Sequence, residues 1–267
     1  MYPFTWHRPR TLAEAVALLA EHEDARPIAG GQTLIPVLRQ RLANPGILID
    51  LEMIPGLQGI RQEDSALIIG AMTRHAEVAE SAVVQRLCPA LAALAAVIGD
   101  RQVRNRGTVG GSIANHDPAA DWPAAALGLG AEMITDRRMI AADRFFSGLF
   151  ETVLEPDEIV TALRLPLPRR AGYARFPNPA SRYALVGVWV AETDSGVRVA
   201  VTGAGAGVFR CQKMEAALIR GFDSTALEGM TIEASGLNSD LHAAADYRAH
   251  LIGVLGRRAV DIAVGGG

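Results

Sequence analysis

The apolar positions in the first third of the chain predict short helices and strands in alternation. Thr11 and Glu14 match the two ends of a capping box, and apolar residues then recur on one helical face. A short apolar run over 27–29, a helix over 33–42 and a strand over 47–51 follow. The first 50 residues therefore predict a compact α/β unit with a glycine turn inside it.

The rest of the chain also alternates between the hydrophobic periodicity of helices and that of strands. The middle part predicts, in order, a strand over 66–69, helices over 73–80, 89–98 and 122–129, and strands over 131–135, 138–141 and 158–165. The last part predicts strands over 183–192 and 197–202 joined by a hairpin turn, then helices over 213–220 and 247–263. Because no regular βαβ rhythm emerges, an α+β fold is favoured over a doubly wound sheet. The proline-rich region 166–179 is the predicted domain boundary.

The totals restrict the class of protein. With 267 residues, 49% hydrophobic and 21% charged, the chain is typical of a soluble globular protein of one large or two ordinary domains. A formal net charge of −3 gives no reason to expect nucleic acid or an acidic membrane surface as a partner. The N-terminus has no apolar signal run, and no stretch approaches the roughly 20 apolar residues of a membrane span. We therefore expect a cytoplasmic protein.

The two cysteines, Cys88 and Cys211, stand alone, without a C-x-x-C pair. Isolated cysteines of this kind are typical of buried core residues in a reducing compartment. We therefore expect no iron–sulfur cluster, zinc site or other metal site within this chain.

Two glycine pairs, each flanked by hydroxyl residues, interrupt the Ala- and Leu-rich sequence at 29–33 and 108–112. Glycine allows close backbone approach and positive φ, so consecutive N–H groups can converge on an anion. Thr33, Thr108 and Ser112 would add hydroxyl donors. Two such turns could hold one pyrophosphate from both sides, although a glycine pair is also typical of a plain tight turn.

The neighbouring motifs leave several interpretations open. Arg101, Arg104 and Arg106 either give the second glycine turn a positive potential or form a solvated face. Neither turn carries the lysine of a P-loop. The glycine-rich stretch 203–207 follows a predicted strand but has Val208 where a dinucleotide fingerprint needs glycine.

Asp117 and Asp121 lie four residues apart in a proline-bounded loop. They suit an acid–base pair, a metal site or contacts to ribose hydroxyls. The sequence around them holds no cluster of His or Glu, which disfavours the metal, and an acidic residue near a dinucleotide site often accepts hydrogen bonds from ribose.

Longer motifs carry a family resemblance. The stretches A-G-G-Q-T-L-I-P at 29–36, I-L-I-D-L at 47–51 and R-N-R-G-T-V-G-G-S-I-A-N-H-D-P-A-A-D-W-P at 104–123 occur in this order. Together they resemble the FAD-binding medium subunit of molybdenum hydroxylases, the carbon monoxide dehydrogenase and xanthine dehydrogenase family. The similarity extends to both ends of the chain. It implies two α/β FAD subdomains, about 1–55 and 56–168, and a C-terminal domain of a sheet and helices over 172–267.

The resemblance implies which residues bind FAD. Residues of the two glycine turns correspond to pyrophosphate loops: Ala29, Gly30, Gly31, Gln32, Thr33 and Leu34 in the first, and Thr108, Gly110, Gly111 and Ser112 in the second. Asn115 and Asp121 correspond to positions along the FAD, with Asp121 at the ribitol or ribose. Ile98 and Val160 correspond to apolar positions beside the flavin.

The sequence departs from the family before the first strand of the last domain. Many members have a lysine, then arginines, then Asp-[Phe/Tyr]-Ala in this region. Here Arg175 takes the place of the lysine, and Arg182 stands where Asp is usual. In the family this loop approaches the flavin, so Tyr183 either covers the flavin ring or begins a strand as a core residue.

The resemblance implies an FAD-carrying electron-transfer subunit of a multi-subunit oxidoreductase. A large subunit with the molybdenum cofactor and a small subunit with [2Fe-2S] clusters would be its partners, as a dimer of heterotrimers. The substrate would be selected in the large subunit, so carbon monoxide, an aldehyde and an N-heterocycle remain open. The alternatives are a stand-alone flavin-dependent reductase or oxidase with a related fold, and a flavin-free scaffold.

Overall fold

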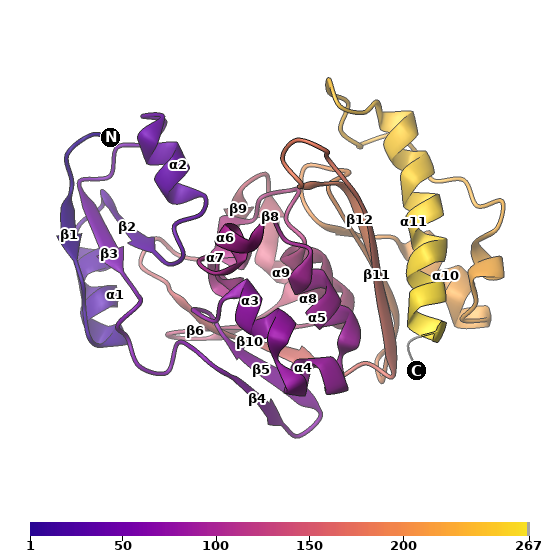
Figure 1. Cartoon of the computed structure of the whole chain (residues 1–267), viewed down its shortest axis with the longest axis horizontal. Coiled ribbons are helices and arrows are strands. Elements are labelled where there is room, and N and C mark those ends of the chain that lie inside the picture. The colour runs from indigo at the N-terminus through magenta and orange to yellow at the C-terminus, as the bar shows by residue number, and fades with distance from the viewer. Residues whose placement is uncertain (266–267) are drawn as a thin grey trace.

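The computed structural model describes residues 1–265, which form sheets of three, five and four strands and a small two-stranded hairpin (Figure 1). Helices pack on each of the three larger sheets, so the α+β fold class is confirmed. Within residues 1–265, no helix is both long and apolar enough to cross a membrane.

The first sheet is parallel, with the strand order β1 (Thr5–His7), β3 (Ile47–Asp50), β2 (Ala25–Ile28). Two helices cover its opposite faces, α1 (Leu12–Glu21) against Ile49 and α2 (Leu34–Arg39) against Leu48. Because neighbouring residues of a strand point to opposite faces of the sheet, Leu48 and Ile49 pack against different helices. The predicted capping box at the start of α1 is confirmed.

The second sheet is antiparallel, with the strand order β4 (Ile60–Glu63), β5 (Ala66–Gly70), β10 (Val160–Pro166), β6 (Glu132–Thr135), β7 (Met139–Ala141). The helices that follow β5 and precede β6 in the sequence all lie on one side of this sheet (Figure 1). They are α3 (His75–Glu80), α4 (Ala82–Leu87), α5 (Pro89–Ala96), α6 (Arg101–Arg104), α7 (Val109–Asn115) and α8 (Trp122–Leu129). After β7 come α9 (Ala142–Phe145) and the hairpin β8 (Phe146–Gly148) and β9 (Glu151–Thr152).

The third sheet is also antiparallel, with the strand order β11 (Arg170–Pro177), β12 (Ala184–Thr193), β13 (Gly196–Thr202), β14 (Phe209–Arg210). The helices α10 (Gln212–Arg220) and α11 (Ala245–Gly265), with the short helix η1 (Ser224–Leu227), pack on one face. Figure 1 shows α8 on the other side of β11 and β12 from α11. Every residue of α8 is buried, because this helix lies in the core that the second and third sheets share.

The hydrophobic pattern predicted most elements at their observed places. The hairpins β6–β7 and β12–β13 and the helix α8 are confirmed, and both cysteines are buried. The elements that were not predicted include short ones such as β1, β4 and α4, and also α7 in the second glycine turn and β11 in the proline-rich region. β11 is an edge strand, where proline is tolerated because one side of the backbone needs no partner. The division of the chain into domains stays a prediction.

Candidate functional site

A cavity of about 600 Å³ lies where loops of the three sheets come together. Its size is typical of small-molecule sites. The main stretches of its wall are 26–34, 107–121, 152–160 and 181–183, which are far apart in the sequence. Every residue predicted to contact the cofactor lines this cavity, with the exception of Arg175. Direct contact of each residue with a cofactor stays a prediction.

The first glycine turn presents a row of free backbone N–H groups. It connects β2 to α2, and Gly31 adopts a left-handed conformation with φ 70°. Within residues 1–265, the N–H groups of Gly30, Gly31, Gln32 and Thr33 donate to no protein acceptor. Consecutive free N–H groups in a turn form a concave anion site. The first turn can therefore bind a phosphate through its backbone.

The two glycine turns touch each other, and only glycine permits this contact. A Cβ atom at Gly30 would lie 2.0 Å from the carbonyl oxygen of Arg106. A Cβ atom at Gly111 would lie 2.8 Å from the Thr108 Oγ1 atom and 3.6 Å from the Ala29 Cβ atom. The two turns, about eighty residues apart in the sequence, therefore lie next to each other, and their joint binding of one pyrophosphate stays a prediction.

The N–H groups of the second turn donate to acceptors within the protein. Val109 donates to the Thr73 carbonyl (3.0 Å) and Gly110 to the Ala71 carbonyl (2.8 Å). The N–H of Gly111 donates to the Thr108 Oγ1 atom at 3.2 Å, which caps α7. The expectation that both turns offer consecutive N–H groups is therefore wrong for the second.

The second turn instead contributes shape and hydroxyl groups. Gly110 packs against Ala71, where a Cβ atom would approach within 2.4 Å. The hydroxyl of Thr108 accepts one hydrogen bond but keeps its own proton to donate. The hydroxyl of Ser112 has no hydrogen-bond partner within residues 1–265. Both can donate to a ligand that the first turn holds.

The three arginines before the second turn do not line the cavity. Arg104 donates to the carbonyls of Ile98 (3.0 Å) and Gly99 (3.3 Å), which supports the cavity wall from behind. Arg106 lies 3.6 Å from the Glu52 carboxylate, and Arg101 is exposed. This placement does not support the hypothesis that these arginines contact a phosphate directly.

Asp121 is a buried cavity residue whose carboxylate is already held by two partners. Its side chain accepts from the Tyr173 hydroxyl, and both of its oxygens accept from the Arg175 Nη1 atom (3.1 and 3.0 Å). Burial raises the pKa of Asp121, and the charge of Arg175 and the hydrogen bond from Tyr173 oppose that rise. A third bond joins Arg175 to the carbonyl of Val97. Arg175 therefore acts on the cavity through Asp121 and the end of α5, not by lining it.

Tyr183 stands at the lip of the cavity, just before β12. Its side chain is 44% exposed and lines the cavity with Thr33. The preceding Arg182 has φ 62°, an unusual conformation for a residue with a side chain. Burial raises the pKa of the Tyr183 hydroxyl, and the carboxylates of Asp117 and Asp121 add to the rise. Tyr183 is therefore a partly exposed residue of the cavity wall and not a core residue.

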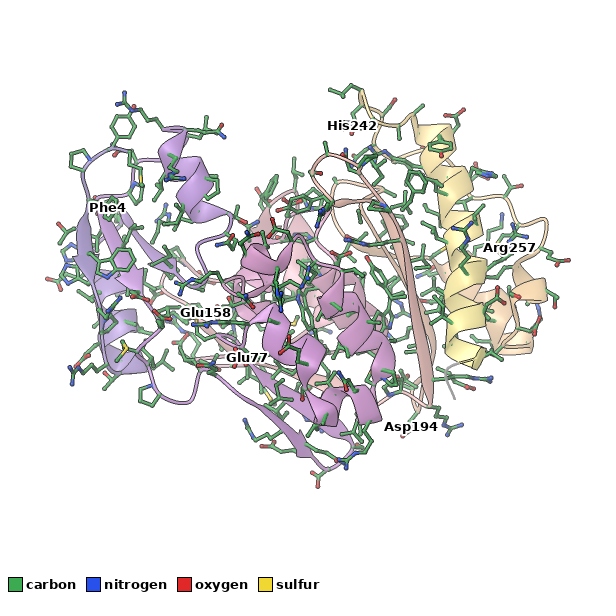
Figure 2. All side chains as sticks on the ribbon, in the orientation of Figure 1. Phe4, Glu77, Glu158, Asp194, His242 and Arg257 are labelled. Carbon is green, nitrogen blue, oxygen red and sulfur yellow. The ribbon has the colours of Figure 1, made fainter. Side chains whose placement is uncertain are left out.

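Glu158 contributes a charged group to the stretch 152–160 of the cavity wall. Figure 2 labels it between the first sheet and the central helices. Its carboxylate pairs with Arg138 at 2.7 Å, and that hydrogen bond lowers the pKa of Glu158 to about 2. Glu158 is therefore ionised and held in place.

His75 and Trp122 form a buried pair beside the cavity. The indole Nε1–H of Trp122 donates to the His75 Nδ1 atom at 3.0 Å, so His75 carries its own proton on Nε2. Burial, with a smaller contribution from the charge of Arg104, lowers the pKa of His75 to about 4. The histidine is therefore neutral near pH 7. Nothing in the sequence pairs these residues, which are 47 positions apart.

This pair makes stability depend on pH. Because the folded-state pKa of His75 lies below the unfolded value of 6.5, the unfolded chain binds more protons between pH 6.5 and about 4. We expect the free energy of unfolding to decrease as the pH is lowered through this window, by up to about 1.4 kcal/mol per pH unit. Urea unfolding at several pH values measures this slope. The double variant His75→Phe/Trp122→Phe should have a shallower slope, and an unchanged slope would contradict the assignment.

Comparisons with known proteins agree with this cavity. A family model described as "FAD binding domain in molybdopterin dehydrogenase" matches residues 2–168. The chain belongs to this family. The predicted family resemblance is therefore confirmed, and the cavity of this FAD-binding family member carries both of the glycine turns on which the resemblance rested.

Relatives of this FAD-binding chain match it along nearly their full length. It is 35% identical to the carbon monoxide dehydrogenase medium chain of Hydrogenophaga pseudoflava, covering 97% of this chain and 96% of that one. It is also 35% identical to the nicotine 6-hydroxylase medium subunit of Paenarthrobacter nicotinovorans, covering 94% of each. Its structure is similar to a reconstituted CO dehydrogenase from Oligotropha carboxidovorans, with a TM-score of 0.93, 35% identity and 100% coverage of both chains.

The residues of the cavity fit FAD. The free N–H groups of Gly30 to Thr33 suit a pyrophosphate. Apolar side chains, including Ile98 and Val160, line other parts of the wall and suit an aromatic ring system. Within residues 1–265, no group of three His, Cys, Asp or Glu residues is placed to hold a metal ion.

Proposed function

We propose that this chain is the FAD-carrying electron-transfer subunit of a multi-subunit molybdenum hydroxylase. It would receive electrons from [2Fe-2S] clusters of a partner subunit and pass them to an external acceptor. The observation that carries the proposal is the row of free N–H groups at Gly30–Thr33, which face a cavity shared with the Thr108 and Ser112 hydroxyls. Such a row is suited to a dinucleotide pyrophosphate.

The residues of this chain would bind and orient the cofactor. The first glycine turn, Ala29 to Leu34, would hold the pyrophosphate, with hydroxyl donors from Thr108 and Ser112 on the opposite side. Ile98 and Val160 would pack on the flavin, and Asn115 and Asp121 would contact its polar chain. Tyr183 at the cavity lip would limit access of water to the ring.

Two carboxylates that line this cavity are already held by protein partners. Asp121 is tied to Tyr173 and Arg175, and Glu158 is tied to Arg138. When bound, FAD supplies the redox chemistry, and the protein supplies binding, orientation and electrostatics. This arrangement favours an electron-transfer role over a stand-alone reductase or oxidase with its own substrate.

Electron carriers other than FAD would be in partner subunits. The cysteines of this chain, Cys88 and Cys211, are both buried in separate cores, and burial raises the pKa of the Cys88 thiol to about 11. They cannot ligate a cluster together. We therefore place the [2Fe-2S] clusters in a small subunit and the molybdenum cofactor in a large subunit, assembled as a cytoplasmic dimer of heterotrimers.

The substrate would be bound in the large subunit. Medium subunits whose names refer to carbon monoxide and to nicotine are equally similar to this chain, so its sequence does not select between their substrates. Carbon monoxide, an aldehyde and an N-heterocycle are all compatible with this subunit.

Isolation of the native complex tests the proposal. The chain is tagged at its C-terminus in its own host, and the complex is purified and analysed by mass spectrometry and metal assay. We expect a molybdenum-containing large subunit and an iron–sulfur small subunit in equal amounts with this chain. A yellow chain that purifies alone and oxidises NAD(P)H or another substrate would support the stand-alone alternative instead.

A further inference from the structure

Asp117 is a cavity residue with an unused acceptor atom. It lies between α7 and α8 and lines the cavity. Its Oδ1 atom accepts from the N–H of Ala119 at 2.9 Å. Within residues 1–265, its Oδ2 atom has no hydrogen-bond partner and no ion pair. One side of this carboxylate is therefore open to a ligand.

The backbone around Asp117 is held in place, so its carboxylate is preorganised. The Asp117 carbonyl accepts from the N–H of Ala120 (2.9 Å). The next carbonyl, that of Pro118, accepts from the Gly203 N–H (2.7 Å) and the Thr202 hydroxyl (3.0 Å). These bonds tie the loop to the end of β13. A side chain on such a fixed loop loses little freedom when it binds a ligand.

Partial burial disfavours the negative charge of the Asp117 carboxylate. Desolvation raises the pKa of Asp117, and the Ala119 N–H and the neighbouring His116 offset part of this rise. A ligand O–H that donates to the Oδ2 atom would stabilise the ionised form. Asp121 offers less, because Tyr173 and Arg175 already take three of the roughly four acceptor positions of its carboxylate.

The cofactor has donors of the matching kind. The ribitol chain and the adenosine ribose of FAD carry hydroxyl groups, and carboxylates are common partners of ribose hydroxyls in dinucleotide sites. We propose that Asp117 binds hydroxyl groups of the FAD, in addition to the role predicted for Asp121. This inference rests on the proposed function, because it takes FAD as the ligand.

Binding measurements on the full chain test the inference. The chain is stripped of flavin and titrated with FAD, with an analogue lacking the 2′-hydroxyl of the adenosine ribose, and with analogues lacking ribitol hydroxyls. Hydrogen bonds to a charged acceptor contribute about 1.5–3 kcal/mol, so Asp117→Asn should weaken FAD binding about 10- to 100-fold. The exposed Asp261→Asn serves as the control and should bind FAD normally.

The analogues identify which hydroxyls Asp117 binds and separate binding from folding. The unmodified chain should lose affinity for the ribose or the ribitol analogue, and Asp117→Asn should show no further loss for the same analogue. If the unmodified chain binds every analogue as tightly as FAD, the inference is overturned without any variant. The inference would also be overturned if Asp117→Asn lost as much further affinity for each analogue, relative to FAD, as the unmodified chain does. If the unmodified chain binds no FAD at all, the proposed function fails instead.

Discussion

Gly111→Asp should yield a chain that retains almost no FAD. Gly111 is the third residue of α7, a position where an acidic side chain favours a helix, but any side chain there requires the Thr108 cap to shift. Its Cβ atom would also lie 3.6 Å from Ala29, where the free N–H groups of the first turn begin. Two like charges about 4 Å apart repel by about 4 kcal/mol at an effective dielectric of about 20, roughly a thousandfold in affinity.

Flavin absorbance per purified chain measures this effect. Gly111→Ala separates the steric part, because its methyl group would lie 2.8 Å from the Thr108 Oγ1 atom and disturb the helix cap. Gly221→Asp is the matched control, since a Cβ atom there meets nothing within 4 Å. Full flavin occupancy in Gly111→Asp would show that the phosphate does not lie between the two turns.

Arg175→Met should destabilise the fold and weaken FAD retention together. The variant leaves the Asp121 carboxylate buried without its ion pair, a change that typically destabilises by about 3–5 kcal/mol. It also releases the Val97 carbonyl, so the wall near Ile98 loses its support. Urea unfolding and flavin titration measure the two effects. The double variant Arg175→Met/Asp121→Asn should recover much of the stability, because no unpaired charge remains.

A surface pair provides the comparison for Arg175. Arg169 and Asp194 form an ion pair at 3.2 Å, but both side chains are largely exposed, and Figure 2 labels Asp194 at the edge of the molecule. Arg169→Met should therefore change stability by less than about 1 kcal/mol. If Arg175→Met were equally mild, Asp121 would not depend on its ion pair, and the positioning role of Arg175 would be wrong.

The sequence predicted those parts of the fold that depend on local chemistry. Thr11 and Glu14 specify a helix start within four residues, and the turn over 193–196 joins two apolar runs that are adjacent in the chain and pair as a hairpin. The helix α7 was not predicted, because its glycines at 110 and 111 are poor helix formers. They are tolerated because tertiary contacts with Ala71 and Thr108 leave no room for side chains.

The candidate site was predictable as a set of motifs but not as a set of partners. The glycine turns could be found because their composition is unusual and their order matches a family. Which N–H groups remain free depends on the carbonyls of Ala71 and Thr73, which the sequence does not connect to the turn. Likewise, Asp121 and Arg175 are 54 residues apart, and only the packing of the third sheet on α8 brings them together.

The distribution of FAD among the subunits tests the central claim most directly. The native complex is separated into its subunits under non-denaturing conditions, and each fraction is assayed for FAD and for this chain. We predict that FAD stays with this chain at one molecule per chain and is absent from the molybdenum and iron–sulfur subunits. A flavin-free chain, or FAD that follows another subunit, would contradict the assignment.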